Sequence, residues 1–122
     1  GRVNWERPRY MASADILCTP CDRASFGMVL LEAMSCGLPV VASKISGFQL
    51  LMENERQGLL IPQATDSDAF ADALTRLVNS PEDRARMGAA GRATAVGEYS
   101  WTCIAERLEE YYESLMREKR RR

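Results

Sequence analysis

The sequence contains no histidine among its 122 residues. This absence excludes a Ser-His or Cys-His nucleophile pair and any metal site that depends on histidine ligands. Acid–base chemistry would therefore depend on carboxylates, lysine, tyrosine or cysteine. No apolar run reaches the roughly 18 residues that a membrane-spanning helix needs, so the sequence predicts no such helix.

Neither sign of charge is in large excess, because the chain has 16 Lys and Arg and 17 Asp and Glu, which gives a net charge of −1. A balanced charge argues against nucleic-acid binding by the whole domain. The few cysteines are too irregularly spaced for the disulfide framework of a secreted protein. They are Cys18, Cys21, Cys36 and Cys103. We therefore expect a cytoplasmic protein with no nucleic-acid partner.

Two of the cysteines form the motif Cys18-Thr19-Pro20-Cys21, which in other proteins is a redox or zinc motif. A redox pair normally opens a helix, whereas here Pro20 ends a predicted strand. There is no second pair of this kind and no histidine, so the ligand set for zinc is incomplete. We predict no metal site and disfavour a redox role.

Short apolar runs alternate with helical patterns along the chain, which predicts an α/β fold with a doubly wound parallel sheet. The predicted strands are 15–20, 38–42 and 58–62, and the predicted helices are 8–13, 26–36, 66–78, one starting at 81, and one starting at 101. Three strands are fewer than the usual four to six or so. The sheet therefore looks like an incomplete Rossmann-like domain.

Some local expectations follow from the same patterns. Helix 26–36 is apolar on every face, which predicts that it is buried all round. A helical turn is expected at 49–53, and the helix from 81 is expected to pause near Gly88 or Gly91. Trp101, Tyr111 and Tyr112 are expected to pack on the sheet or on a partner domain.

The predicted sheet also indicates where a ligand binds, because open parallel sheets bind ligands at the carboxyl ends of their strands. Two loops lie there, at 18–27 and 43–50. The first enters its helix through Ser25-Phe26-Gly27, and a helix start offers free backbone amides that suit a phosphate. Gly27 would let a ligand approach the backbone closely.

Glu32 is the only charged residue between Ser25 and Lys44. An unpaired buried carboxylate is costly, so Glu32 must face a partner or a polar cleft. One interpretation is a salt bridge to an arginine or lysine. The other is a carboxylate that accepts hydrogen bonds from sugar hydroxyls. From these residues alone both interpretations stay open.

The run SFGMVLLEAMSCGLPVVAS at 25–43 closely resembles the donor-binding signature of retaining group 1 glycosyltransferases of the GT-B fold. The resemblance continues through 58–62, the helix at 66–78 and Tyr99-Ser100-Trp101. It implies that 1–100 form part of the Rossmann-like, C-terminal, nucleotide-sugar-binding domain. It also implies that 101–122 form a crossing helix with a basic tail.

Site residues follow from the resemblance, position by position. Glu32 matches the glutamate that holds the ribose hydroxyls of the nucleotide. The turn and helix start contact the donor sugar or diphosphate, and the loop after the next strand lies beside the same pocket. These positions are Phe26, Gly27, Met28 and Val29 in the first segment, and Ser46 and Gly47 in the second.

Two departures from the family pattern bear on activity. Ala24 stands where the family has a glutamate that contacts the donor sugar, so no catalytic residue is assigned and turnover should be reduced. The loop that in the family reads roughly Gly-Gly-x-Pro-Glu is here Ser46-Gly47-Phe48-Gln49-Leu50.

The resemblance implies the donor-binding portion of an enzyme that moves a sugar from a nucleotide-diphosphate sugar to an acceptor. The sugar nucleotide is then a substrate, and no cofactor is expected. The chain should be inactive alone and should need an N-terminal domain from the same or another chain. The alternative, favoured by Ala24, is a non-catalytic relative that acts as a binding or regulatory module.

A basic run closes the chain. Its cations are Arg117, Lys119, Arg120, Arg121 and Arg122. The first interpretation is a solvated helix end whose charge complements the helix dipole. The second is weak contact with anionic lipid head groups, which would make the protein peripheral to a membrane.

Overall fold

The computed structural model describes residues 5–121 and contains one parallel sheet. Its strands, in the order β1-β2-β3, are β1 (Leu17–Thr19), β2 (Val40–Ser43) and β3 (Gly58–Ile61). Thr19 pairs with Ala42 and Ala42 pairs with Leu60, so all three strands end at the same edge. This is the edge at which a ligand is expected.

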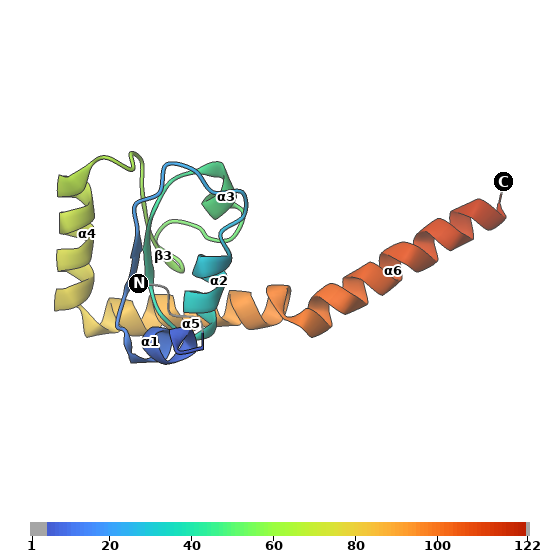
Figure 1. Ribbon diagram of the computed structural model, residues 1–122, viewed down its shortest axis with the longest axis horizontal. Coiled ribbons are helices and arrows are strands. Elements are labelled where there is room, and N and C mark those ends of the chain that lie inside the picture. The colour runs from blue at the N-terminus through green and yellow to red at the C-terminus, as the bar shows by residue number, and fades with distance from the viewer. Residues whose placement is uncertain (1–4, 122) are drawn as a thin grey trace.

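The described residues form six helices. They are α1 (Arg7–Ser13), α2 (Met28–Ser35), α3 (Ser46–Gln49), α4 (Ser67–Asn79), α5 (Pro81–Tyr99) and α6 (Trp101–Arg120). In Figure 1, α4 lies on one side of the sheet and α2 and α3 lie on the other, while α5 runs across the lower end. The last helix, α6, extends away from the rest of the molecule.

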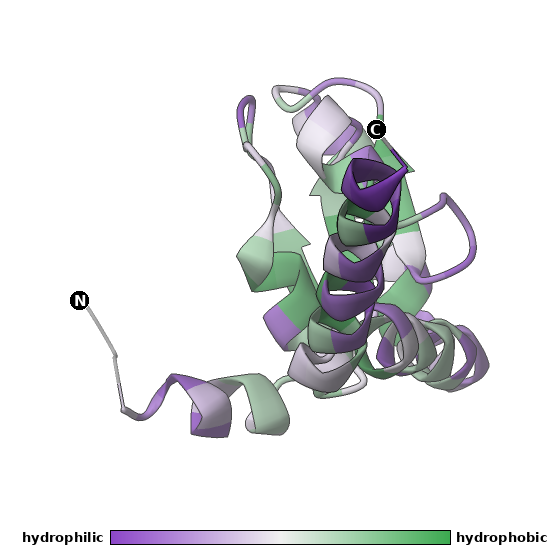
Figure 2. Ribbon diagram, turned by 90° about the vertical axis from the view of Figure 1, so that its right-hand side faces the viewer, coloured by the Kyte–Doolittle hydropathy of each residue, from purple (hydrophilic) through white to green (hydrophobic). Residues whose placement is uncertain are grey.

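Hydrophobic cores on both faces of the sheet account for this arrangement. Val40 and Ala42 point into a core that they share with α2, and Val41 points into a second core that it shares with α4. Alternate residues of a strand face opposite sides, so a strand buried on both faces reads as a continuous apolar run. Figure 2 shows the hydrophobic colour concentrated on the strands and on α2. The predicted α/β fold, a partial Rossmann-like sheet with a long C-terminal helix, is confirmed.

Three helices begin where capping residues predict. The side chain of Asp66 accepts a hydrogen bond from the amide of Ala69 at 3.0 Å. Ser80 accepts from Asp83 at 3.2 Å, and Ser100 accepts from Cys103 at 3.3 Å. Each cap satisfies one amide that the helix itself leaves unpaired.

Two local predictions are wrong, and side-chain packing explains both. The helical turn lies at Ser46–Gln49 rather than 49–53, because Phe48 is buried in the first core and draws the turn toward it. The helix α5 continues through Gly91 without a pause. A methyl group at Gly91 would lie only 3.1 Å from the Cγ of Met34, so the glycine permits the close packing of α5 on α2.

The prediction that α2 is buried all round is also wrong. Leu30, Ala33 and Met34 are buried against the sheet and α5, but Met28 is 57% exposed and Val29 is 37% exposed. The reason is that neighbouring elements cover only one side of α2. The other side, which we call the open face of α2, carries apolar residues to the surface at the carboxyl edge of the sheet.

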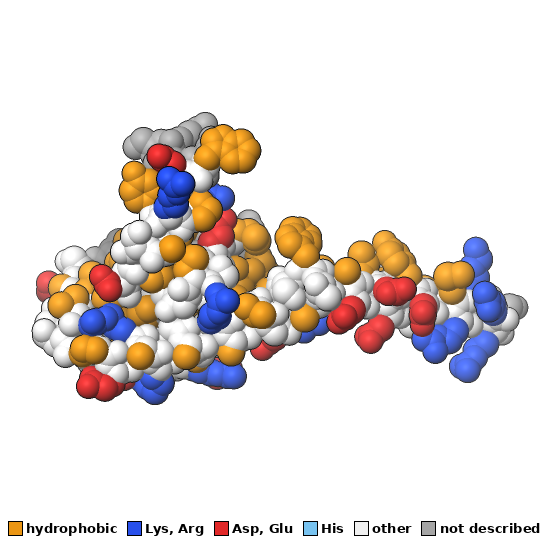
Figure 3. Space-filling model, turned by 90° about the horizontal axis from the view of Figure 1, so that it is seen from below, with side chains coloured by type: hydrophobic (Ala, Val, Ile, Leu, Met, Phe, Trp, Pro, Cys, Tyr) orange, Lys and Arg blue, Asp and Glu red, His pale blue; other side chains and the backbone are white. Residues whose placement is uncertain are grey.

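Trp101, Tyr111 and Tyr112 do not pack on the sheet, and their packing on a partner domain stays a prediction. Trp101 is 86% exposed, and Tyr111 and Tyr112 are also exposed. They lie on α6, which has no buried residue. Figure 3 shows hydrophobic side chains along one edge of α6 and acidic side chains along the opposite edge. Across the part of the chain that the structure describes, no helix is both long and apolar enough to cross a bilayer.

Ion pairs join the turn before β3 to α4 and α5 at the opposite end of the sheet. Arg76 contacts Glu55 at 2.5 Å and Asp83 at 3.0 Å, and Arg86 contacts Asp83 at 2.7 Å. The hydrogen bond from Arg76 holds the pKa of Glu55 below its usual value. Hydrogen bonds from Arg86 and then Arg76 do the same for the pKa of Asp83.

These lowered pKa values predict a pH-dependent effect of Arg76→Gln on thermal unfolding. Both carboxylates are charged and paired at neutral pH, so the substitution should lower the melting temperature there. As the pH falls through the lowered pKa values, the folded state loses this stabilisation, and the difference from wild type should vanish. Arg92→Gln is the control, because Arg92 donates to the carbonyl of Ser35, which does not titrate. An equal Arg76→Gln effect at neutral and acid pH would contradict the prediction.

Candidate functional site

A cavity of about 400 Å³ lies where the loops after β1 and β2 meet. Its lining residues are Asp22, Arg23, Ala24 and Ser25 from the first loop and Ile45 and Ser46 from the second. The parallel register brings both loops to the same edge. Of the residues that the sequence pointed to, Ala24 and Ser46 therefore share one cavity.

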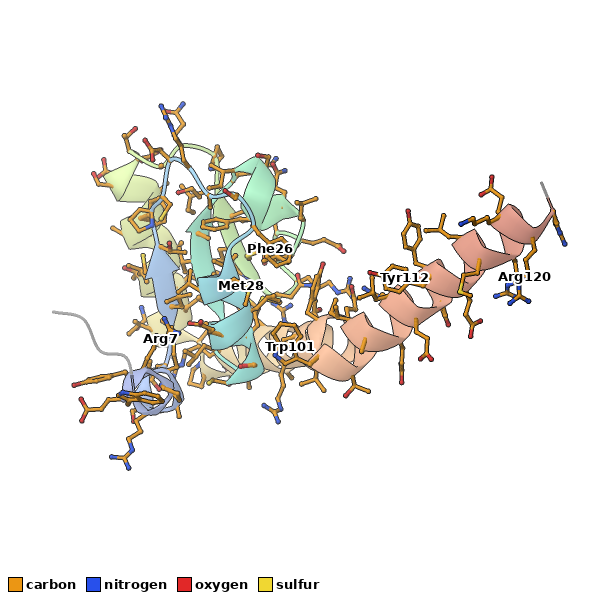
Figure 4. All side chains as sticks on the ribbon, turned by 45° about the vertical axis from the view of Figure 1, so that its right-hand side comes forward. Arg7, Phe26, Met28, Trp101, Tyr112 and Arg120 are labelled. Atoms are coloured by element: carbon orange, nitrogen blue, oxygen red, sulfur yellow. The ribbon has the colours of Figure 1, made fainter. Side chains whose placement is uncertain are left out.

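The helix α2 begins directly after this cavity. Its N-cap is Gly27, at φ +97°, and no side chain caps the helix. The first-turn amides, at Met28 and Val29, are therefore not covered by a capping group. Such amides, with the positive end of the helix dipole, suit an anionic ligand. Figure 4 shows Phe26 and Met28 close together at this end of α2.

Glu32 lies one turn further along, on the open face of α2, and is paired with Arg7 of α1. The two side chains approach to 3.1 Å, and that of Glu32 is 31% exposed. Glu32 lines a separate hollow of about 200 Å³, which includes Arg7, Pro8 and Met11 from α1. The structure thus shows the salt bridge and leaves the carboxylate reachable from solvent, but does not place Glu32 in the cavity beside Ala24.

Gly47 does not line the cavity in the way that Ser46 does. It is buried in α3, and a side-chain carbon there would overlap the carbonyl oxygen of Ala24. The two loops are thus in backbone contact at this point. The geometry gives Gly47 a supporting position behind the cavity wall.

Three side chains near the candidate site were given no role in the reasoning from sequence. Arg7 pairs with Glu32, and Phe48 lies beneath Gly27. Tyr99 packs its ring edge-on against Phe26, with 6.0 Å between ring centres, and donates a hydrogen bond to the carbonyl of Leu50 at 3.2 Å. Of these three, Phe48 could have been found from the sequence, because a large apolar residue in a polar loop segment indicates a buried contact.

The cysteine pair lies beside this edge as two free thiols. Partial burial raises the pKa of the Cys18 thiol, which lowers the fraction present as the reactive thiolate. The sulfur of Cys21 lies 3.2 Å from the hydroxyl of Thr19. A raised thiol pKa is the opposite of what a redox-active cysteine needs.

The basic end of α6 is far from the cavity in the view of Figure 4, where Arg120 marks it. Arg117 pairs with Glu113 at 3.2 Å. Lys119, Arg120 and Arg121 are exposed. Arg122 lies outside the described residues.

The family described as "Glycosyl transferases group 1" matches residues 1–94. The chain belongs to this family. The group 1 signature thus extends over the strands and loops that form the cavity and over most of α5.

Curated members of the group 1 family resemble this chain closely. The phosphatidyl-myo-inositol mannosyltransferase of Mycobacterium leprae is 43% identical over 106 residues, which are 86% of this chain and 28% of that protein. The D-inositol 3-phosphate glycosyltransferase of Saccharomonospora viridis is 38% identical over 104 residues, 85% of this chain and 24% of that protein. The chain therefore spans about a quarter of the length of these relatives.

Solved structures in the same family share the fold. The sucrose-phosphate synthase of Thermosynechococcus elongatus superposes with a TM-score of 0.85 at 32% identity, over 95% of this chain and 29% of that one. Anabaena HepE in complex with UDP gives a TM-score of 0.84 at 27% identity, over 91% of this chain and 30% of that one. The fold is that of part of a GT-B glycosyltransferase.

Proposed function

We propose that this chain forms the donor-binding part of a glycosyltransferase that moves a sugar from a nucleotide-diphosphate sugar to an acceptor. The observation that carries the proposal is the cavity between Asp22–Ser25 and Ile45–Ser46, which adjoins the uncapped start of α2. Its place at the carboxyl edge of a parallel sheet is the place where such folds bind nucleotides. HepE, a structural relative, has been solved with UDP and with UDP-glucose.

The proposed donor lies along the open face of α2. First-turn amides at Met28 and Val29 bind the diphosphate or sugar end, with Phe26 and Gly27 beside them. Glu32 binds the ribose hydroxyls through carboxylate oxygens, which accept two hydrogen bonds when Arg7 moves aside. No metal or organic cofactor has a part in this proposal, and the sugar nucleotide is consumed as substrate.

The acceptor site belongs, in this proposal, to residues outside the chain. The relatives named above are more than three times as long, and one of them is named a phosphatidyl-myo-inositol mannosyltransferase. We therefore propose that these 122 residues do not transfer sugar alone and act together with an N-terminal domain. Residues 1–100 supply the donor site, and 101–122 supply the helix that reaches the other domain.

Titration calorimetry on the full-length protein tests donor binding. UDP and GDP should bind at micromolar concentrations, and UMP and GMP should bind at least about tenfold more weakly, because they lack the second phosphate that meets the helix start. Equal affinity for mono- and diphosphates, or no binding of either, would contradict the proposal.

A second candidate function rests on Ala24, which lines the cavity where the family pattern has a glutamate. In this alternative the protein is a non-catalytic relative that binds a sugar nucleotide or a partner without turnover. Nucleotide binding is compatible with both candidates, so turnover must distinguish them.

A further inference from the structure

The turn that starts α2 rests on the ring of Phe48. Gly27 adopts φ +97°, a conformation that favours glycine. A side-chain carbon at Gly27 would lie 2.8 Å from the Cδ1 of Phe48 and 3.4 Å from a methyl carbon of Leu51. The ring thus lies directly against the backbone of the turn. Phe48 itself is only 1% exposed, so solvent does not reach the ring.

The segment of α3 that carries Phe48 also touches the cavity wall. At Gly47, the residue before it, a side-chain carbon would overlap the carbonyl oxygen of Ala24 and would lie 3.2 Å from the carbonyl carbon of Ser25. Ser46, one residue earlier, lines the cavity itself. Three consecutive residues thus join the second loop to the first.

The other end of the same contact region is held by α5. Tyr99 packs edge-on against Phe26 and donates a hydrogen bond to the carbonyl of Leu50, just after α3. The loop before α2 and the segment around α3 are therefore connected on both sides. The ring of Phe48 lies between α3 and the turn at Gly27, next to the contact of Gly47 with Ala24.

We propose that Phe48 is a positioning residue for donor binding. By filling the space beneath Gly27, its ring holds the left-handed turn, aims the first-turn amides of α2, and sets the distance between Asp22–Ser25 and Ile45–Ser46 before a ligand arrives. This proposal rests on the proposed function, since it concerns the same site. Pre-formed geometry of this kind raises affinity because the ligand does not have to order the site.

Phe48→Leu and Phe70→Leu form a matched pair of variants. Phe70, on α4, is also buried, but it belongs to the core on the other face of the sheet. Both substitutions remove a buried ring and should lower the melting temperature of the full-length protein. Only Phe48→Leu should weaken UDP binding, by about tenfold in calorimetry well below the melting temperature. It should also speed amide hydrogen exchange across 22–29, which Phe70→Leu leaves unchanged.

The outcomes separate this proposal from the one it rests on. If both variants bind UDP as wild type does and exchange across 22–29 is unaltered, Phe48 has only a packing role and the proposal is overturned. If wild type binds neither UDP nor GDP, the proposed function fails, and the exchange experiment alone decides whether Phe48 holds the turn. Phe48→Met, whose unbranched and flexible side chain fits irregular core spaces, replaces Phe48→Leu if that variant does not fold.

Discussion

Glu32→Ala is expected to weaken the binding of UDP-glucose or GDP-mannose to the full-length protein by about 10- to 100-fold. The reason is the loss of hydrogen bonds from ribose hydroxyls to a charged carboxylate, and a net loss of about 1.5–3 kcal/mol corresponds to this range. The side chain is partly exposed on the open face of α2, so it can reach a ligand there. Calorimetry with both donors measures the change.

Arg7→Ala is the matched control, because it breaks the same salt bridge and keeps the carboxylate. The pair is half-exposed, so its loss should cost little stability. If Glu32 binds ribose, Arg7→Ala keeps or raises donor affinity, because the carboxylate no longer has to leave the salt bridge, while Glu32→Ala loses it. If Glu32 only forms a salt bridge, the two variants leave donor affinity equally unchanged, and the assignment of Glu32 to the ribose is wrong.

Ala24→Glu is expected to raise the rate of sugar transfer by about 100-fold or more, the order of effect that one well-placed electrostatic group has on a reacting centre. Ala24 lines the cavity, and its carbonyl is already in contact with α3, so the backbone that would carry the new carboxylate is held in place. Release of UDP from UDP-glucose, or of GDP from GDP-mannose, by the full-length protein measures turnover.

Ala24→Gln distinguishes charge from size in this experiment. Glutamine fills nearly the same volume as glutamate but carries no charge, so it should stay near the wild-type rate. If Ala24→Glu transfers sugar and Ala24→Gln does not, the protein is a glycosyltransferase whose rate is limited by the alanine at position 24. Equal inactivity of both variants, with donor binding intact, would favour the non-catalytic binding module.

Much of the fold could be predicted because the relevant signals are local. The β-branched run at β2, the proline and serine at the start of α5, and Asp66 before α4 each determine an element through backbone preference and capping. The site was partly predictable for the same reason. Ser25-Phe26-Gly27 between a strand and a helix predicts a helix start at the carboxyl edge of the sheet. The candidate cavity adjoins this helix start.

The errors share a physical cause, since each depends on what lies next to a residue in space. Met28 and Leu30 are both apolar, yet only Leu30 meets the sheet side of α2, while Met28 faces outward. Trp101 is large and aromatic, as many core residues are, but it projects from α6 and is exposed among the described residues. Periodicity identifies a helix and does not show how many of its sides are covered.

For Glu32, the sequence determined the need for a partner but not which residue it is. Its isolation among apolar neighbours requires a polar partner, and that much follows from the cost of burying a charge. The identity of the partner, Arg7, depends on how α1 packs on α2, and no spacing in the chain encodes it.

Local chemistry along the chain was thus sufficient for the order of the strands and of most helices, and for the edge of the sheet at which the candidate cavity lies. Tertiary packing alone decided that Phe48 lies under Gly27, that Gly47 supports Ala24, and that Glu32 meets Arg7. The difference is physical. Capping and alternation act between residues a few positions apart, whereas each of these three contacts joins segments at least about twenty residues apart, which only the folded sheet brings together.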